Sequence, residues 1–315
     1  MKHLVLGGAG FLGSWLVSAL LEDPGSEVAV FDCQENDFIR SIDSPRFSFV
    51  QGTFDADVDF CALLTGVDVV YHLISTTVPG NSNTRLLYDV TSNIIPTLRL
   101  LDACVACGVG KVVFFSSGGT VYGVQSGAGP ILESAPTNPI SSYGVQKLAI
   151  EKYLKLFNYN YGLEYLIVRL SNPFGPRQNI SGRQGVVTTF TYRVLHDLPI
   201  TLYGDGSVVR DYIDVRDAVS MVINAAGHAS AAGIYNIGSG IGYSLKQIIS
   251  IVEERTGKKA AIDCRLGRSE DVPVNVLSIE KYLHEVSPVR PRALEEGIDD
   301  LIAYFNKQDI ERNRC

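Results

Sequence analysis

The sequence lacks the long apolar segments of membrane-spanning and exported proteins. It has no stretch of about 18 or more uninterrupted apolar residues, which is close to the minimum for a membrane-spanning helix. Its first residues, Met1 to Leu6, already follow a strand pattern, with no charged segment, apolar segment and cleavage site before them. We therefore expect a cytoplasmic protein that has no membrane partner.

Basic charge and paired cysteine motifs are also scarce. The 27 Lys and Arg residues are outnumbered by 34 Asp and Glu, and the resulting net charge of −7 argues against a nucleic-acid partner. The six cysteines are expected to be reduced thiols, because no export signal accompanies them. Cys104 and Cys107 form a lone CxxC in an apolar helical run, and without a second pair we expect no metal site.

The pattern that remains is typical of an α/β fold. The chain has 315 residues, of which 46% are hydrophobic, enough for one large domain or two domains. Short apolar, β-branched runs alternate with helical stretches, which predicts a doubly wound parallel sheet of the Rossmann type. The predicted strands are Lys2–Leu6, Glu27–Phe31, Arg46–Val50, Asp68–Leu73, Lys111–Ser116 and Glu164–Leu170, and the predicted helices are Gly10–Leu21, Asp59–Leu64, Asn93–Cys107 and Tyr143–Tyr161.

Beyond Asn172 the texture of the sequence changes. Pro173, Gly175 and Pro176 break the chain, and shorter elements separated by Gly-containing loops follow. We therefore predict a cofactor-binding Rossmann domain over residues 1–172. A second, smaller α/β lobe over 173–315 would bind the substrate, and some of its segments are expected to return to the first domain.

The first predicted strand leads into a glycine turn and then into an apolar helix. Gly7, Gly10 and Gly13 would let the turn tighten, let the backbone approach a pyrophosphate and let the helix lie close to the strand. The helix N-terminus would offer free N–H groups to that pyrophosphate. Asp32, at the end of the second strand, is placed to accept hydrogen bonds from a ribose and would repel a 2′-phosphate. The segment therefore predicts NAD as the cofactor, and a plain Gly-rich turn beside a surface aspartate is the alternative.

The ends of the third and fourth strands lie where the rest of a dinucleotide would pass. His72 follows three apolar residues in a buried strand, so we interpret it as a hydrogen-bonded core residue. The cofactor contacts predicted at these two strand ends are Thr53, Phe54, Leu73, Ile74 and Ser75.

Tyr143 and Lys147 are spaced four residues apart, which places both on one face of a helix. A free tyrosine titrates near pH ~10, and a neighbouring ammonium or a nicotinium ring would stabilise its phenolate. Tyr143 could then take a proton from a sugar hydroxyl. Lys147 would also hold the nicotinamide ribose, and Ser117, at the end of the fifth strand, could bridge Tyr143 and the substrate oxygen. Ordinary turn serines are the alternative for the Ser117 region.

Together these motifs resemble an extended short-chain dehydrogenase/reductase of the NAD-dependent epimerase/dehydratase family, and they are most similar to the UDP-sugar 4-epimerases. The resemblance covers nearly the whole chain. The motifs that carry it are GGAGFLG at 7–13, Asp32, HLIS at 72–75, SSGGTVYG at 116–123, YGVQK at 143–147, RLSNPFGPRQ at 169–178, RDYIDVRD at 210–217 and RSEDV at 268–272.

The resemblance implies further contacts for the cofactor and for a nucleotide-sugar substrate. Arg210 and Arg268 would pair with the substrate phosphates, because a guanidinium fork matches their geometry. Asp271 would accept a hydrogen bond from the nucleotide ribose. The other implied contacts are Asn172 and Val187 with the substrate, and Phe11, Leu12, Ser116 and Pro173 with the cofactor.

The sequence departs from the family at the hydroxyl position. Many members carry a catalytic Ser or Thr where this chain has Gly118, so we assign that role to Ser117. Dehydratases of the family carry an Asp-Glu pair where this chain has Gly119 and Thr120, which favours epimerisation at C4 through a 4-keto intermediate. Another reaction of the family (4-ketoreduction, dehydration or decarboxylation) and a non-catalytic NAD-binding regulator remain the alternatives.

The resemblance also bears on the sugar and on assembly. A family position beside the hexose C2 substituent matches Asn275, whose small side chain would admit and hydrogen-bond an N-acetyl group. We therefore expect UDP-N-acetylhexosamines, as well as UDP-glucose, among the substrates. The predicted helices Asn93–Cys107 and Tyr143–Tyr161 resemble those that pair across a two-fold axis in the family, which implies a homodimer.

Overall fold

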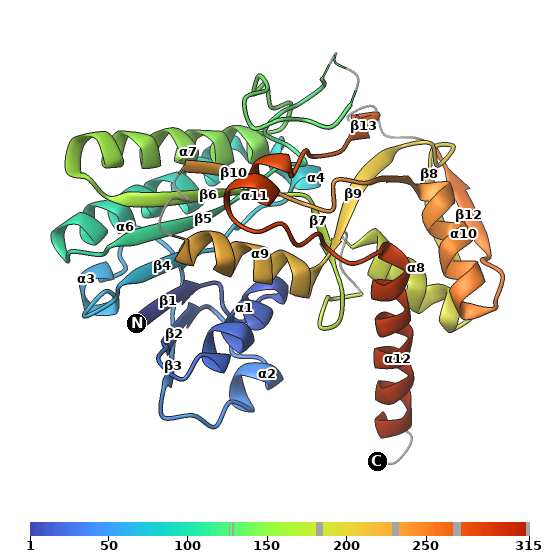
Figure 1. Ribbon diagram of the computed structural model, residues 1–315, viewed down its shortest axis with the longest axis horizontal. Helices are drawn as coiled ribbons and strands as arrows, with labels where there is room; N and C mark the ends of the chain where they lie inside the picture. Colours follow the sequence, from blue (N-terminus) through green and yellow to red (C-terminus); the bar gives the residue numbers. More distant parts are fainter. Residues whose placement is uncertain (126, 128, 181–184, 229–232, 267–271, 313–315) are drawn as a thin grey trace.

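The computed structural model describes residues 1–125, 127, 129–180, 185–228, 233–266 and 272–312. Its largest element is a seven-stranded sheet with the order β10-β6-β5-β4-β1-β2-β3, in which every neighbouring pair is parallel (Figure 1). The strands are β1 Lys2–Leu6, β2 Glu27–Asp32, β3 Phe47–Gln51, β4 Val69–His72, β5 Lys111–Ser117, β6 Glu164–Leu170 and β10 Gly233–Ile237. The predicted doubly wound α/β fold is confirmed.

Helices cover both faces of this sheet, as Figure 1 shows. One face packs against α1 (Phe11–Glu22), α2 (Asp37–Arg40) and α9 (Val215–Gly227) through an aliphatic core. The other face packs against α3 (Phe60–Leu63), α6 (Ile95–Ala106) and α7 (Ser142–Tyr161). Because both faces are buried, the central strands read as continuous apolar runs and not as alternating ones.

Two predicted helices differ from the observed ones. The segment predicted as one helix from Asn93 begins as a π-helical turn, Val90–Ile94, and becomes α-helical only at Ile95. The predicted helix Asp59–Leu64 is observed as the single turn α3. It begins at Phe60, because Asp59 is its N-cap and accepts a hydrogen bond from the Ala62 N–H at 3.1 Å. The short helices α4 Pro79–Ser82, α5 Leu86–Asp89 and α11 Glu280–Glu285 lie in connections.

The chain leaves the sheet after β6 and returns to it at β10. Between them lie β7 (Asn172–Phe174), α8 (Val186–Leu195), β8 (Ile200–Tyr203), β9 (Val209–Asp214) and α9, so α9 and β10 complete the large sheet after an excursion through other elements. The division at residue 172 that the sequence suggested stays a prediction.

A second core gathers α8, α10 (Leu245–Thr256) and α12 (Leu294–Arg312) around a small two-stranded sheet of β8 and β12 (Ile262–Arg265). A third sheet joins this lobe to the first. Its strands are β11 (Gly242–Ser244), β9, β13 (Val274–Asn275) and β7. Since β7 follows β6 directly in the chain, the third sheet begins at the carboxyl end of β6. None of the described helices combines the length and apolar character needed to cross a bilayer.

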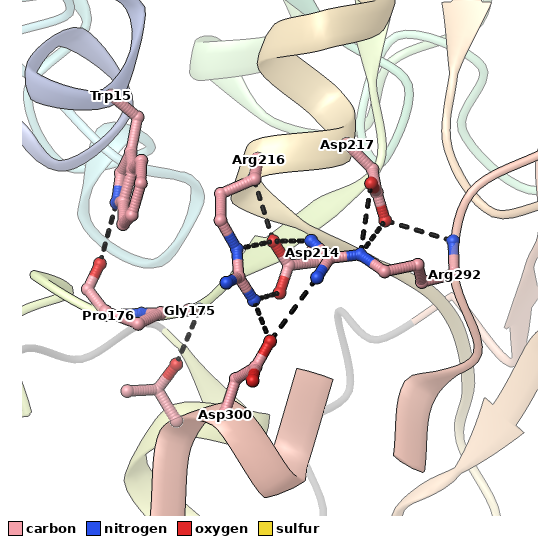
Figure 2. A network of polar contacts seen from close by, with 9 residues as sticks. Trp15, Gly175, Pro176, Asp214, Arg216, Asp217, Arg292 and Asp300 are labelled. Atoms are coloured by element: carbon pink, nitrogen blue, oxygen red, sulfur yellow. Dashed lines mark hydrogen bonds and ion pairs between the residues drawn. The ribbon is translucent and has the colours of Figure 1, made fainter. Parts of the chain in front are cut away.

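An ion-pair network fastens α12 to the start of α9, next to the turn at Gly175 and Pro176 (Figure 2). Its centre is Asp214, the N-cap of α9, whose side chain is 2% exposed. The Asp214 carboxylate accepts hydrogen bonds from the guanidinium groups of Arg216 at 2.8 Å and Arg292 at 3.1 Å. It also accepts one from the Arg216 backbone N–H at 2.8 Å. Asp217 and Asp300 complete the charge balance around the two arginines.

Replacing Asp214 with Ala should lower the free energy of unfolding by about 2–3 kcal/mol. Breaking a buried ion pair costs about 3–5 kcal/mol, and the partial exposure of Arg216 and Arg292 reduces that cost. Urea unfolding followed by circular dichroism measures the loss. Asp263→Ala, which breaks the exposed pair with Arg265, is the control and should leave the midpoint unchanged. Equal midpoints for the two variants would contradict a stabilising role of the network.

Candidate functional site

The glycine turn between β1 and α1 is closed too tightly to admit side chains. Gly7 has φ +87°, a left-handed conformation that L-residues rarely adopt. A Cβ atom on Gly13 would lie 2.1 Å from the carbonyl oxygen of Gly7, so α1 can approach the turn this closely only with glycine there. The N-cap of α1, Gly10, offers no side chain to the first N–H groups of the helix. Phe11 and Leu12, both half-buried, form the first turn and bring those N–H groups to the site.

Asp32 lies beside this turn. Its Oδ2 accepts a hydrogen bond from the Ala9 N–H at 3.0 Å, and the Asn36 side chain donates to the Ala9 carbonyl at 2.6 Å. The carboxylate is half-buried and therefore held in place while remaining accessible. A bare helix N-terminus and an oriented acid, joined by a turn without side chains, fit the pyrophosphate and one ribose of a dinucleotide.

The end of β4 lies against the same turn. A Cβ on Gly7 would be 3.2 Å from the Ile74 side chain, and the Leu73 N–H donates to the Leu6 carbonyl at 3.0 Å. Ser75 is half-buried and donates to the Thr77 carbonyl at 3.1 Å. Leu73, Ile74 and Ser75 thus line the carboxyl end of β4, as the sequence predicted for cofactor contacts, although the contacts themselves stay a prediction.

The predicted adenine-side residues differ from each other in exposure. Thr53 is exposed, whereas Phe54 is 5% exposed and packs against Phe60 and His72, with ring centroids 5.7 and 5.0 Å apart. His72 is a core residue, as expected. Its Nε2 lies 2.9 Å from the Thr97 hydroxyl, and burial lowers its pKa to about 3.

Helix α7 brings Tyr143 and Lys147 to the end of β5. The helix begins where the Ser141 hydroxyl caps it, accepting a hydrogen bond from the Gly144 N–H at 3.2 Å. The Lys147 ammonium, 3% exposed, donates to the Phe115 carbonyl at 2.8 Å and lies 5.7 Å from the centroid of the Tyr143 ring. Tyr143 is half-buried and shares a side-chain hydrogen bond with Ser117, so the three predicted catalytic residues meet at one place.

Burial dominates the titration of both groups on α7. It raises the pKa of Tyr143 to about 12, and the hydrogen bond with Ser117 opposes this only in part. It lowers the pKa of Lys147 to about 7, against the attraction of the Glu151 carboxylate. Tyr143 is therefore a phenol at neutral pH, while Lys147 is close to the midpoint of its own titration. The predicted lowering of the Tyr143 pKa is not observed, because desolvation raises the pKa and only the hydrogen bond with Ser117 opposes it.

The backbone at Gly118 is packed too closely to carry the hydroxyl side chain that the resemblance implies at this position. A Cβ on Gly118 would lie 2.5 Å from Cδ1 of Leu277 and 3.1 Å from the Arg169 carbonyl oxygen. The Gly118 N–H donates to the Leu170 carbonyl at 2.8 Å, which fixes the backbone in that position. Ser117 is the neighbouring hydroxyl that reaches Tyr143. Ser116 points elsewhere and donates to the buried Glu151 carboxylate at 2.6 Å.

The third sheet gathers several of the predicted substrate residues. Asn172 pairs with Tyr212 in register, and Asn275 with Arg210. The Asn172 side chain donates to the Asp211 carbonyl at 2.8 Å, and the Arg210 guanidinium donates to the Val272 carbonyl at 2.6 Å.

Asn275 connects this sheet to the carboxyl end of β5. It is 1% exposed, and its Nδ2 donates to the Gly118 carbonyl at 3.1 Å, while its Oδ1 is buried without a partner among the described residues. Pro173 is half-buried and accepts a hydrogen bond from Gln178 at 3.2 Å.

Of the predicted substrate residues that the structure describes, Val187 and Asn275 are buried. Val187 is fully buried in the first turn of α8, within the core of the second lobe, so its predicted contact with substrate stays a prediction. Arg268 and Asp271 lie outside the described residues. Within the described ranges, no group of three or more His, Cys, Asp or Glu side chains is arranged to hold a metal ion.

Sequence patterns did not single out two buried carboxylates that shape the site. Asp211, between Arg210 and Tyr212, accepts hydrogen bonds from the Ser239 N–H and hydroxyl at 2.8 and 2.9 Å and so holds the turn beside Arg210. Burial raises its pKa, and these hydrogen bonds oppose the rise. Asp89 accepts a hydrogen bond from the Ser142 hydroxyl at the start of α7. Asp211 belongs to a recognised motif, whereas nothing in the spacing of Asp89 links it to α7.

Known proteins are similar to this chain over almost their full length. Residues 3–238 match the family described as the NAD dependent epimerase/dehydratase family. The chain is 33% identical over 314 residues to the UDP-glucose 4-epimerase of Mycolicibacterium smegmatis, covering 98% of this chain and 99% of that protein.

Two solved structures have the same overall fold. The chain is similar to the UDP-glucose 4-epimerase of Thermotoga maritima solved with UDP-glucose, with a TM-score of 0.90, 33% identity and coverage of 98% and 99% of the two chains. It is also similar to the UDP-glucose 4-epimerase of Thermus thermophilus in complex with NAD, with a TM-score of 0.87, 33% identity and coverage of 97% and 99%.

Introducing the usual family hydroxyl by Gly118→Ser should destabilise the protein by about 1–3 kcal/mol and should not raise activity, because the new side chain overlaps Leu277. Combining it with Leu277→Ala makes room. The double variant should therefore lose less stability than the sum of the two single variants, as measured by urea unfolding. Strictly additive losses would show that Leu277 does not exclude a side chain from this position.

Proposed function

The chain belongs to the NAD-dependent epimerase/dehydratase family, and on that premise we propose that it is a 4-epimerase of UDP-sugars with NAD as its cofactor. The observation that carries the proposal is the meeting of Tyr143, Ser117 and Lys147 at the carboxyl end of β5. That point lies on the same sheet edge as the glycine turn and Asp32.

The residues that would hold NAD fit it on structural grounds. The turn at Gly7 to Gly13 has no side chains between its backbone and a pyrophosphate, and Asp32, held by the Ala9 N–H beside the turn, would accept from the ribose. A carboxylate at that position disfavours a 2′-phosphate, which supports NAD over NADP. When bound, NAD supplies the acceptor and donor of a hydride. Lys147 would bind the nicotinamide ribose next to Tyr143.

Tyr143 moves the proton in this proposal. As C4 of the sugar is oxidised, Tyr143 in its phenolate form takes the proton of the 4-hydroxyl, directly or through the Ser117 hydroxyl, and the resulting phenol returns the proton when C4 is reduced on the opposite face. Burial, opposed in part by the hydrogen bond with Ser117, raises the pKa of Tyr143 to about 12, so the base form requires positive charge next to the ring. The Lys147 ammonium provides part of that charge.

Elimination of water fits the site less well than epimerisation. Expelling a hydroxyl needs an acid near the leaving oxygen. Gly119 has no side chain to offer, and the Thr120 hydroxyl is buried without a partner among the described residues. The similar M. smegmatis and T. maritima proteins are named UDP-glucose 4-epimerases, which supports a UDP-linked substrate.

We infer a homodimer from the helices α6 and α7, which pack side by side. Their outer surface is apolar for a surface helix, with Ile95 39%, Val145 53%, Tyr153 36% and Leu156 48% exposed. Burying this stripe against a second copy across a two-fold axis would remove it from water. Light scattering at micromolar concentration should give twice the chain mass of 34.3 kDa, and a monomer there would contradict the dimer. The expectation of a cytoplasmic protein stays a prediction.

Tyr143→Phe should reduce the turnover number by about two to four orders of magnitude, as expected when a general acid–base group is lost. The phenyl ring keeps the packing, so the unfolding midpoint and the KM for the UDP-sugar should change little. Ser117→Ala should reduce turnover by less. The measurement is conversion of UDP-glucose or UDP-N-acetylglucosamine, with the epimers separated chromatographically.

Thr120→Ala is the matched control for loss of a nearby hydroxyl and should reduce turnover less than Ser117→Ala. A turnover number for Tyr143→Phe within a factor of about two of the natural protein would refute the proton transfer. Net consumption of NADH, or formation of a 4-keto product, would instead favour reduction or dehydration.

Asn275 is proposed as the residue that admits an N-acetyl group at C2 of the sugar. Asn275→Tyr should lower the ratio of kcat/KM for UDP-N-acetylglucosamine over UDP-glucose, because it fills a position that is now almost fully buried. Asn275→Ala keeps the room but removes the amide and the bond to Gly118. If Asn275→Tyr leaves the ratio unchanged, Asn275 does not select the sugar.

A further inference from the structure

A buried carboxylate lies one helical turn beyond the Tyr143 and Lys147 pair and has no part in the proposed reaction. Glu151 is 1% exposed and follows Lys147 by four residues, as Lys147 follows Tyr143. The three side chains therefore share one face of α7. A carboxylate this deeply buried is rare unless a cation and hydrogen bonds compensate the loss of hydration.

The partners of Glu151 come from the two strands that meet at the site. The Ser116 hydroxyl of β5 donates to its Oε1 at 2.6 Å. The Arg169 guanidinium of β6 donates to Oε1 at 3.0 Å and to Oε2 at 2.7 Å, a bidentate pair whose side chains are 4% and 1% exposed. Glu151 thus joins α7, which carries Tyr143 and Lys147, to the strand that carries Ser117.

Arg169 is itself held from several sides, so the Glu151 carboxylate has a rigid partner. Its Nη1 donates to the Glu133 carbonyl at 3.1 Å, and its guanidinium carbon lies 4.8 Å above the Tyr122 ring. Burial opposes the charge of Arg169, but hydrogen bonding and attraction to Glu151 raise its pKa. Arg169 therefore keeps its charge, and its bidentate contact fixes the Glu151 carboxylate on the face of α7 that it shares with Lys147.

We propose that Glu151 is a positioning residue of the epimerase site: it fixes the end of β5 against α7 through Ser116, and its carboxylate, on the same face of α7, favours the ammonium form of Lys147. The proposal rests on the proposed function only for its effect on turnover. A purely apolar contact between α7 and β6 could replace the buried Glu151 and Arg169 pair without loss of stability. The proposal therefore gives the pair a role other than stability.

The surroundings of Lys147 leave Glu151 as the group that favours its charge. On the other elements packed around it are His72 of β4, which burial keeps neutral, and the Phe115 carbonyl and the Phe114 ring of β5. Tyr143 on α7 is neutral at pH 7, since burial raises its pKa to about 12. Burial lowers the pKa of Lys147 to about 7, and attraction to Glu151 is what opposes that shift.

The direction of the pH effect follows. Removing the carboxylate takes away the attraction that raises the pKa of Lys147, so the ammonium is lost at lower pH. Because the ammonium supports the base form of Tyr143, turnover should decrease as Lys147 loses its proton at high pH. Without the Glu151 carboxylate, this alkaline limb of the pH profile should lie at lower pH. A residue that only stabilises the fold would reduce the unfolding midpoint without moving this limb.

The first experiment compares Glu151→Gln with Ser116→Ala. Glu151→Gln should move the alkaline limb of the kcat profile to lower pH by about one pH unit, the size expected for loss of an opposite charge at short range. Ser116→Ala removes the contact with β5 but no charge, so it should lower kcat without moving the limb. Glu164→Gln on β6, which pairs with Lys111 at the surface, is the control and should change neither.

A second measurement needs no substrate and no bound cofactor. Lysine labelled with ¹³C at Cε reports the titration of Lys147 by NMR, and its signal is assigned by its loss in Lys147→Arg. In Glu151→Gln this titration should shift to lower pH in parallel with the limb. If no UDP-sugar is turned over, the proposed function fails, while this titration still tests the role of Glu151.

A lysine titration that is unchanged in folded Glu151→Gln, or an equal displacement of the limb in Ser116→Ala, would overturn the proposal. If Glu151→Gln leaves Arg169 uncompensated and fails to fold, the double variant Glu151→Gln/Arg169→Gln removes both buried charges. Its Lys147 signal should still titrate at lower pH than in the natural protein, and an unshifted signal there would also overturn the proposal.

Discussion

The parallel direction of all seven strands is the constraint on which the site depends. Parallel strands place their carboxyl ends on one edge of the sheet, and the loops that leave this edge bring their side chains together. The glycine turn after β1, Asp32 at the end of β2, Ile74 after β4 and Ser117 at the end of β5 therefore come together although more than a hundred residues separate the first from the last in the chain.

Burial determines the chemistry available at this edge. The same desolvation that raises the pKa of Tyr143 lowers that of Lys147, so the phenol holds its proton more tightly than the ammonium does. In water they would both be protonated at neutral pH and would differ little from surface residues. Helix α7 achieves the burial by packing on β5 and β6, and the Glu151 and Arg169 pair provides charges inside that interface.

The second lobe is attached at the same edge by a small number of polar contacts. β7 continues from β6 into the third sheet, and Asn275 of β13 reaches back to Gly118 at the end of β5. Asp214 and the arginines around it fix α12 and α9 relative to each other. A displacement of the lobe would therefore act on the backbone next to Ser117.

The sequence by itself determined the parallel α/β fold, the glycine turn and the face of α7 that carries Tyr143 and Lys147. These follow from local patterns: apolar runs with strand length, glycines at fixed offsets and a four-residue helical spacing. It also indicated Ser117 as the hydroxyl beside Tyr143, although it offered no reason for the glycine at 118.

Only the tertiary structure decided the rest. The side chain of Leu277, far away in the chain, excludes a hydroxyl at Gly118, and Asn275 meets the same residue from another sheet. Glu151 looks in the sequence like any acid on a helix, and only its burial against Ser116 and Arg169 gives it a role. Contacts of this kind depend on which distant segments the fold brings together, and the strength of a charge depends on how much water the surrounding protein removes.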